Sequence, residues 1–170
     1  MRNAFVEEIT KISKNNKKIV LLAGDIGYKL YDEFKLKYPT RFYNCGVAEA
    51  NMNTVAAGLA LKGFRPITYT IATFNVYKTV EQIKIDIAYP NLPVIIVGVG
   101  AGLSYSGLGS THHATEDIGV LRSIPGIKII SPADSLETVK ALEAALKSDS
   151  STYIRLTGSS NNPSVNKNDY

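Results

Sequence analysis

The chain has 170 residues, of which 45% are hydrophobic and 20% are charged, and its formal net charge is +4. This length and balance indicate one soluble globular domain with its own hydrophobic core. There is no apolar run of about 18 residues and no signal-peptide pattern, so we expect a cytoplasmic protein with no membrane segment. The lysines near the start, at positions 11, 14, 17 and 18, have no aromatic residues between them and predict a solvated helix face without nucleic-acid binding.

Apolar residues recur at helical spacing at the start of the chain, which predicts a helix over residues 3–14. The continuous apolar run Ile19 to Ala23 is typical of a strand that is buried on both faces of a parallel sheet. The alternation continues, with helices expected over residues 30–38, 48–61, 74–88, 115–123 and 134–147, and strands over 41–45, 66–70, 93–99, 127–130 and 152–156. Residues 100–110 form a glycine-rich stretch with no helical or strand period.

Six strands that alternate with helices predict an α/β fold. We expect a doubly wound, mostly parallel six-stranded sheet with helices on both faces, formed by one domain over residues 1–157. Residues 158–170 have the composition of a linker or disordered tail. The single cysteine, Cys45, has no CxxC or Cys/His companion, so it is interpreted as a buried small side chain, and no metal site is expected in this chain.

Glu49 is an acid in an unusual place, because it opens a helix rich in Ala, Val, Leu and Met and has almost no charged residue near it in sequence. A helix N-terminus stabilises an ionised carboxylate by about 0.3–1 kcal/mol when exposed, whereas burial among apolar groups favours the protonated form. A carboxyl group that keeps its proton can donate a hydrogen bond or relay a proton. The alternative is an acid that serves only the helix dipole and the helix cap.

Ligands of parallel sheets bind beyond the carboxyl ends of the strands, and four segments of this chain meet that condition. Asp25 follows the first strand, Glu49 the second, Phe74 the third and the pair His112–His113 the loop after the fourth. Each has an ordinary explanation: a turn acid, core aromatics for Phe74 and Tyr77, and surface histidines. Their shared edge nevertheless predicts a cofactor or substrate site. The turn at Asp25 lacks the third glycine of a dinucleotide fingerprint and the Gly-Lys-Ser/Thr of a P-loop, so neither nucleotide site is expected.

Two motifs carry a family resemblance. The segment from Gly46 to Gly63, GVAEANMNTVAAGLALKG, resembles the glutamate segment of the pyrimidine-binding domain of transketolase-type thiamine diphosphate enzymes. The segment from Thr111 to Gly126, THHATEDIGVLRSIPG, resembles the Thr-His-Gln loop and the following Leu-Arg-x-Ile-Pro helix of the same family. With the later Ser-Pro-Ala-Asp at 131–134, the resemblance spans roughly residues 19–157.

The resemblance implies roles for named residues. Glu49 would hydrogen-bond N1′ of the cofactor's aminopyrimidine ring, and Phe74 would stack on that ring. It implies catalytic roles for Glu49 and His112, and substrate contacts from His112 and His113. The implied cofactor-binding residues are Asp25, Glu49, Ile71, Phe74 and Tyr77.

Departures from the family pattern affect the expected substrate and assembly. In this family an acid contacts the donor's hydroxyl group, and Leu108 stands in its place. Gly100 replaces a histidine that contacts phosphate, and Gly158 lies in the segment where an arginine is expected. A non-standard ketose or an activated sugar is therefore an open alternative as the substrate. The Gly-Asp-Gly and Asn-Asn pair that binds the diphosphate and Mg²⁺ in this family is not found in this sequence. The resemblance therefore implies a split transketolase, in which a diphosphate-binding subunit with Mg²⁺ completes the site, homodimerisation occurs and a heterotetramer forms.

The expected activity is the transfer of a two-carbon ketol unit between sugars or sugar derivatives. Other reactions of the same superfamily remain open, namely 1-deoxyxylulose-phosphate synthesis and 2-oxo acid decarboxylation or dehydrogenation. A non-catalytic binding domain of the same fold is a further alternative.

Overall fold

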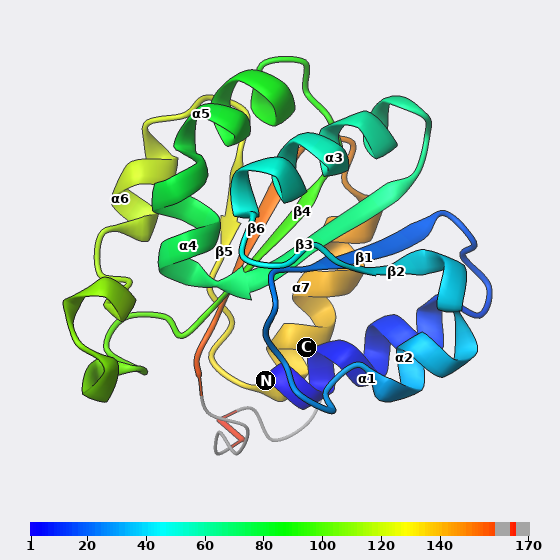
Figure 1. Cartoon of the computed structure of the whole chain (residues 1–170), viewed down its shortest axis with the longest axis horizontal. Coiled ribbons are helices and arrows are strands. Elements are labelled where there is room, and N and C mark those ends of the chain that lie inside the picture. Colours follow the sequence, from blue (N-terminus) through cyan, green and yellow to red (C-terminus); the bar gives the residue numbers. More distant parts are fainter. Residues whose placement is uncertain (159–163, 166–170) are drawn as a thin grey trace.

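The computed structural model describes residues 1–158, 164 and 165, and it contains one six-stranded sheet (Figure 1). The strand order is β2-β1-β3-β4-β6-β5, and each neighbouring pair is parallel. The strands are β1 (Ile19–Ala23), β2 (Phe42–Asn44), β3 (Arg65–Ile71), β4 (Ile95–Val99), β5 (Lys128–Ile130) and β6 (Thr152–Leu156). The predicted α/β fold is confirmed, and the pairing is entirely parallel.

Helices cover both faces of the sheet, because its central strands are apolar on both sides (Figure 1). One face carries α1 (Arg2–Ile12), α2 (Asp32–Lys37) and α7 (Ser135–Lys147), which bury a cluster around Phe5, Phe34 and Leu142. The other face carries α3 (Glu49–Leu61), α4 (Ala72–Val76), α5 (Val80–Gln82) and α6 (Asp117–Arg122), which bury a cluster around Met52, Ile83 and Leu121. No helix of the described residues is both long and apolar enough to cross a bilayer.

The prediction of one continuous helix over residues 74–88 is wrong. The segment consists of α4, a 3-10 turn η2 (Tyr77–Thr79), α5 and a π-helical turn η3 (Ile83–Ala88). The hydroxyl group of Thr79 donates to the carbonyl oxygen of Asn75 at 2.6 Å. Such a bond from Thr to the preceding turn competes with regular helical hydrogen bonding and bends the chain. The break places Lys78 on the short turn between two helices.

The glycine-rich stretch after β4 is a loop that folds back on itself. It contains the 3-10 turns η4 (Ser106–Leu108) and η5 (Ser110–His112), and Gly102 pairs with Ala114 in an isolated antiparallel bridge. A further 3-10 turn, η1 (Pro39–Arg41), precedes β2. Helix α6 begins at Asp117, later than expected, because this loop continues through Glu116. Most of the predicted tail over 158–170 lies outside the described residues.

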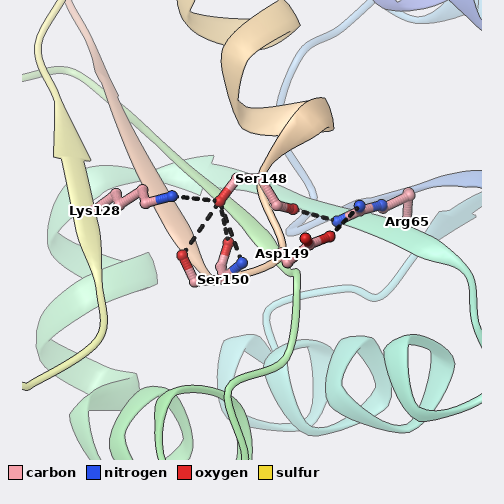
Figure 2. Close-up of polar contacts among 5 residues, drawn as sticks. All are labelled: Arg65, Lys128, Ser148, Asp149 and Ser150. Atoms are coloured by element: carbon pink, nitrogen blue, oxygen red, sulfur yellow. Dashed lines mark hydrogen bonds and ion pairs between the residues drawn. The ribbon is translucent and has the colours of Figure 1, made fainter.

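The amino ends of the strands are held by a separate polar cluster (Figure 2). Arg65, at the start of β3, donates to the carbonyl oxygen of Ser148 at 2.6 Å and lies 3.5 Å from a carboxylate oxygen of Asp149. Lys128, at the start of β5, donates to the hydroxyl oxygen of Ser148 at 2.9 Å, and the backbone N–H of Ser150 donates to the same oxygen at 3.2 Å. These bonds fix the turn between α7 and β6 at the edge of the sheet opposite the carboxyl ends.

Candidate functional site at the carboxyl edge of the sheet

Glu49 is the first residue of α3, and the chain reaches it by a sharp turn after β2. Gly46 provides that turn with a φ of +67°, a backbone conformation that residues with a Cβ atom rarely adopt. The side chain of Glu49 is only 1% exposed. The sequence therefore identified a buried acid correctly, and its position at the start of the helix also places it in the favourable field of the helix dipole.

The sequence predicted almost no charge around Glu49, and this prediction is wrong. The ammonium group of Lys78 forms an ion pair and a hydrogen bond with Oε2 of Glu49. Lys78 belongs to η2 and was not among the predicted site residues. A signal was present in the sequence, because Lys78 follows Phe74 by four residues, the spacing that places two side chains on one face of a helix.

Phe74 and His112 lie beside this ion pair. Their rings are 5.1 Å apart between centroids and meet at 73°, an edge-to-face arrangement. The Nζ atom of Lys78 also lies 5.6 Å from the centroid of the Phe74 ring, within reach of a cation–π contact. The structure thus joins Glu49, Lys78, Phe74 and His112 through direct contacts, although they come from three separate segments of the chain.

Tyr77 and His113 line a neighbouring cavity of about 610 Å³, together with Ser110, Thr115 and Glu116. The hydroxyl group of Tyr77 donates to Oε2 of Glu116 at 2.8 Å and accepts from the backbone N–H of Glu116 at 3.0 Å. Burial and the Glu116 bond raise the pKa of Tyr77 to about 12, and the same hydroxyl group lowers the pKa of Glu116. This pair joins η2 to the segment that precedes α6.

Asp25 and Ile71 are less closely connected to Glu49. Asp25 is exposed, accepts a hydrogen bond from the side-chain amide of Asn44 at 2.9 Å, and lines a different cavity of about 510 Å³ with Lys29. Ile71 is half-buried and precedes the first turn of α4. Among the described residues, no hydrogen bond or ion pair joins either residue to Glu49. Both nevertheless lie at the carboxyl edge, as expected.

A buried amide network fixes the elements that carry Glu49 and Lys78. The side-chain amide of Asn53 in α3 donates to Oδ1 of Asn75 at 3.1 Å and to Oγ1 of Thr79 at 3.0 Å. Asn75 in turn donates to the carbonyl oxygen of Val97 in β4 at 2.9 Å. The network ties α3 to the α4–η2 segment and to the sheet. The sequence did not reveal this network, because Asn residues in helical patterns usually indicate exposed positions.

A second buried group holds the histidine loop against the sheet. Asp117 is fully buried, and its Oδ2 atom accepts hydrogen bonds from Tyr153 at 2.7 Å and from Nε of Arg155 at 2.9 Å. Arg155 also donates to the carbonyl oxygen of Ala114 at 2.9 Å. Because Tyr153 and Arg155 belong to β6, these bonds anchor the end of the loop that carries His112.

The chain is similar to known proteins in sequence and in fold. The chain matches the family described as transketolase, pyrimidine binding domain, over residues 1–162. It is 34% identical over 169 residues to a subunit of the apulose-4-phosphate transketolase of Phocaeicola vulgatus, covering 99% of this chain and 54% of the relative. It is also 34% identical over 157 residues to a 6-deoxy-6-sulfo-D-fructose transketolase subunit of a Clostridium species, covering 92% of this chain and 49% of the relative.

A solved structure described as "split gene transketolase, inactive beta4 tetramer" superimposes with a TM-score of 0.85 at 33% identity. The match covers 98% of this chain and 53% of that structure. The chain thus spans about half the length of the relatives that it matches. With a family match over residues 1–162 and these relatives, the chain belongs to the transketolase pyrimidine-binding domain family.

Proposed function

We propose that this chain is the pyrimidine-binding part of a split, thiamine diphosphate-dependent transketolase that transfers a two-carbon ketol unit between sugars or sugar derivatives. The observation that carries the proposal is the buried carboxyl group of Glu49 at the carboxyl edge of the sheet, which contacts the same ammonium group of Lys78 as the Phe74 ring does. A flat heterocycle with a ring nitrogen is bound by two kinds of contact: a hydrogen bond in the plane of the ring, which the carboxyl group can make, and an aromatic surface against the face of the ring, which Phe74 can provide.

The residues present fit the aminopyrimidine half of the cofactor. When bound, thiamine diphosphate supplies the nucleophilic carbon that carries the two-carbon unit. Glu49 would bind N1′ and hold a proton at that atom, Phe74 would stack on the ring, and Asp25, Ile71 and Tyr77 would line the rest of the cofactor pocket. The proposed role of His112 is proton transfer and substrate contact, and its ring already lies against Phe74. His113 borders the adjacent cavity and is proposed as a substrate contact.

The donor in this proposal is a ketose or a ketose derivative. The relatives described above are named for apulose 4-phosphate and for 6-deoxy-6-sulfo-D-fructose, which are both sugars with an anionic substituent. Leu108 and Gly100 stand where the family has an acid and a histidine, so we propose that this chain reads its donor through other groups.

The proposed assembly has a separate diphosphate-binding subunit, with Mg²⁺, and pairs of each subunit in a heterotetramer. The relatives named as subunits support a partner, and the related structure is described as a tetramer of one chain. Helix α3 and the turn η3 pack against one another. Four large apolar side chains are exposed in these two segments: Val55 and Leu61 in α3, Ile85 in η3 and Tyr89 directly after η3. Apolar side chains exposed together in this way are typical of contacts between subunits.

Titration calorimetry on the lone chain, followed by reconstitution, tests this function. Alone, the chain should bind thiamine diphosphate poorly and catalyse nothing, since the diphosphate has neither a metal ion nor its usual receptor. Addition of a diphosphate-binding transketolase subunit with Mg²⁺ should produce saturable cofactor binding and ketol transfer from a ketose donor. Product analysis with ketose and pyruvate donors separates this reaction from the other reactions of the superfamily. Micromolar, Mg²⁺-dependent binding by the lone chain would contradict the proposed division of the site.

A further inference from the structure

The ammonium group of Lys78 makes the two contacts that the proposed function assigns to the aminopyrimidine ring. It hydrogen-bonds Oε2 of Glu49, and it lies 5.6 Å from the centroid of the Phe74 ring. An ammonium group is a cationic hydrogen-bond donor that is also attracted to an aromatic face, so it can substitute for a heterocycle that hydrogen-bonds the acid and stacks on the ring. The heterocycle and the ammonium group cannot occupy this position together.

The two side chains of the ion pair differ in how easily each can leave the contact and reach water. The Glu49 side chain is 1% exposed, whereas the Lys78 side chain is 47% exposed. Removing the partner of a buried carboxylate leaves an uncompensated charge, which is costly. The lysine, by contrast, reaches water by rotating its own flexible side chain, and exposed ammonium groups are strongly hydrated. Glu49 therefore stays in place and needs a partner, while Lys78 can be replaced.

The backbone around Lys78 is held on both sides, so this exchange requires no movement of the turn. Tyr77 is bonded to Glu116, and Thr79 is bonded to Asn53 and to the carbonyl oxygen of Asn75. The Lys78 side chain lies between these two anchored residues and is half-exposed.

We propose that Lys78 is a displaceable counter-ion, which holds Glu49 in position in the cofactor-free chain and gives way to the aminopyrimidine ring when the cofactor binds. This inference rests on the proposed function. Lys78 is then a positioning residue that acts through Glu49. Its presence keeps the buried acid paired and lowers the affinity for the cofactor, because each binding event must first break the ion pair.

The test is an NMR titration of the full chain with the aminopyrimidine portion of thiamine, which lacks the thiazolium ring and the diphosphate. Lys78→Met removes the competing ammonium group, so it should bind this probe about five-fold more tightly than the unmodified chain, the scale of one half-exposed ion pair. Lys78→Gln gives a second uncharged variant with the same expected direction. Lys78→Arg keeps the charge and the ability to pair with a carboxylate, and it should restore the weaker binding.

The matched control is Lys62→Met, which removes the same charge at the far end of α3, about 20 Å from Glu49 along the helix axis, and should leave the affinity unchanged. In a Glu49→Gln background, Lys78→Met should have no effect on the probe. Equal or weaker probe binding by both uncharged Lys78 variants would overturn this inference alone. Probe binding that is absent from every variant, including the uncharged Lys78 variants, would overturn this inference but not the proposed function, which already expects weak cofactor binding by the lone chain. Probe binding that is insensitive to Glu49→Gln would overturn the proposed function and this inference with it.

Discussion

Asn53 in α3 donates a hydrogen bond from its side-chain amide to Oδ1 of Asn75 in α4 across 3.1 Å, and both side chains are completely buried. The same amide also bonds Thr79, so one side chain in α3 sets the position of the turn that carries Lys78. Buried amide networks of this kind stabilise a protein only when both partners are present, because a lone polar group in the core loses its hydration without compensation.

Asn53→Ala should therefore lower the free energy of unfolding by about 1–3 kcal/mol, the cost of leaving buried hydrogen-bonding groups unsatisfied. Urea unfolding followed by circular dichroism measures this change. Asn51→Ala, at an exposed position two residues earlier on the same helix, should change the stability by at most about 0.5 kcal/mol. Equal stabilities of the two variants would show that the network contributes nothing.

Glu49→Gln should leave the fold intact and nearly abolish the activity of the reconstituted complex. The fold is expected to survive because the released Lys78 side chain is half-exposed and can be hydrated. An amide cannot exchange a proton with N1′ as a carboxyl group does. Exchange of the C2 proton of bound cofactor, measured by quenched NMR, should slow markedly. Glu81→Gln, at an exposed position on α5, is the control, and exchange at the unmodified rate in Glu49→Gln would refute the proposed role.

Phe74→Ala should weaken cofactor binding to the reconstituted complex. The aromatic pair contributes about 0.5–1.5 kcal/mol, and the loss of buried ring surface adds to this. Phe74→Leu keeps an apolar side chain and should recover part of the affinity. Calorimetric titration with thiamine diphosphate measures both. If alanine and leucine variants bind the cofactor as tightly as the unmodified chain, Phe74 does not contact the pyrimidine ring.

Arg155→Met should destabilise the chain by about 3–5 kcal/mol, because it leaves the fully buried carboxylate of Asp117 without its cationic partner. Arg122→Met removes the same charge at an exposed position of α6 and should have little effect. Thermal unfolding distinguishes the two. Combining Arg155→Met with Asp117→Asn should recover part of the loss, since the unpaired charge is then absent, and a failure to recover it would show that packing of the Arg155 stem dominates.

The stability should fall at alkaline pH, and Tyr77 contributes to this fall. Its folded pKa, about 12, is above the ordinary value of 10.0. A raised pKa stabilises the fold fully below pH 10.0 and loses that contribution as the pH rises to about 12. Tyr77→Phe should flatten the decline in the free energy of unfolding over this window. The buried phenols of Tyr31 and Tyr153, whose pKa values are also raised, should preserve part of the decline from pH 10.0 upward, because they lose their protons first in the unfolded chain. An unchanged slope between pH 10.0 and about 12 in Tyr77→Phe would contradict the role of the Tyr77–Glu116 pair.

The sequence by itself determined the sheet and the edge at which the site lies. The apolar runs of β1 and β4 are typical of strands buried on both faces, and helices between successive strands favour parallel pairing. Parallel strands bring their carboxyl ends to one edge, so the sequence placed Asp25, Glu49, Phe74 and His112 at that edge, although only the last three are joined there through Lys78 and ring contacts. The bend within residues 74–88 could not be predicted from hydrophobic periodicity. It depends on the hydrogen bond from the Thr79 hydroxyl group to the carbonyl oxygen of Asn75, and the hydroxyl group could equally have bonded to water.

The partners of the polar groups at that edge were decided only by the tertiary structure. Glu49 lies 29 residues from Lys78, Tyr77 lies 39 residues from Glu116, and Asp117 lies 38 residues from Arg155. Hydrophobic periodicity states which face of a helix is buried, but it does not fix how far the helix slides or rotates over the sheet. Those two quantities decide which charged groups come within hydrogen-bonding distance, so the lysine that pairs with the buried acid became visible only in the packed structure.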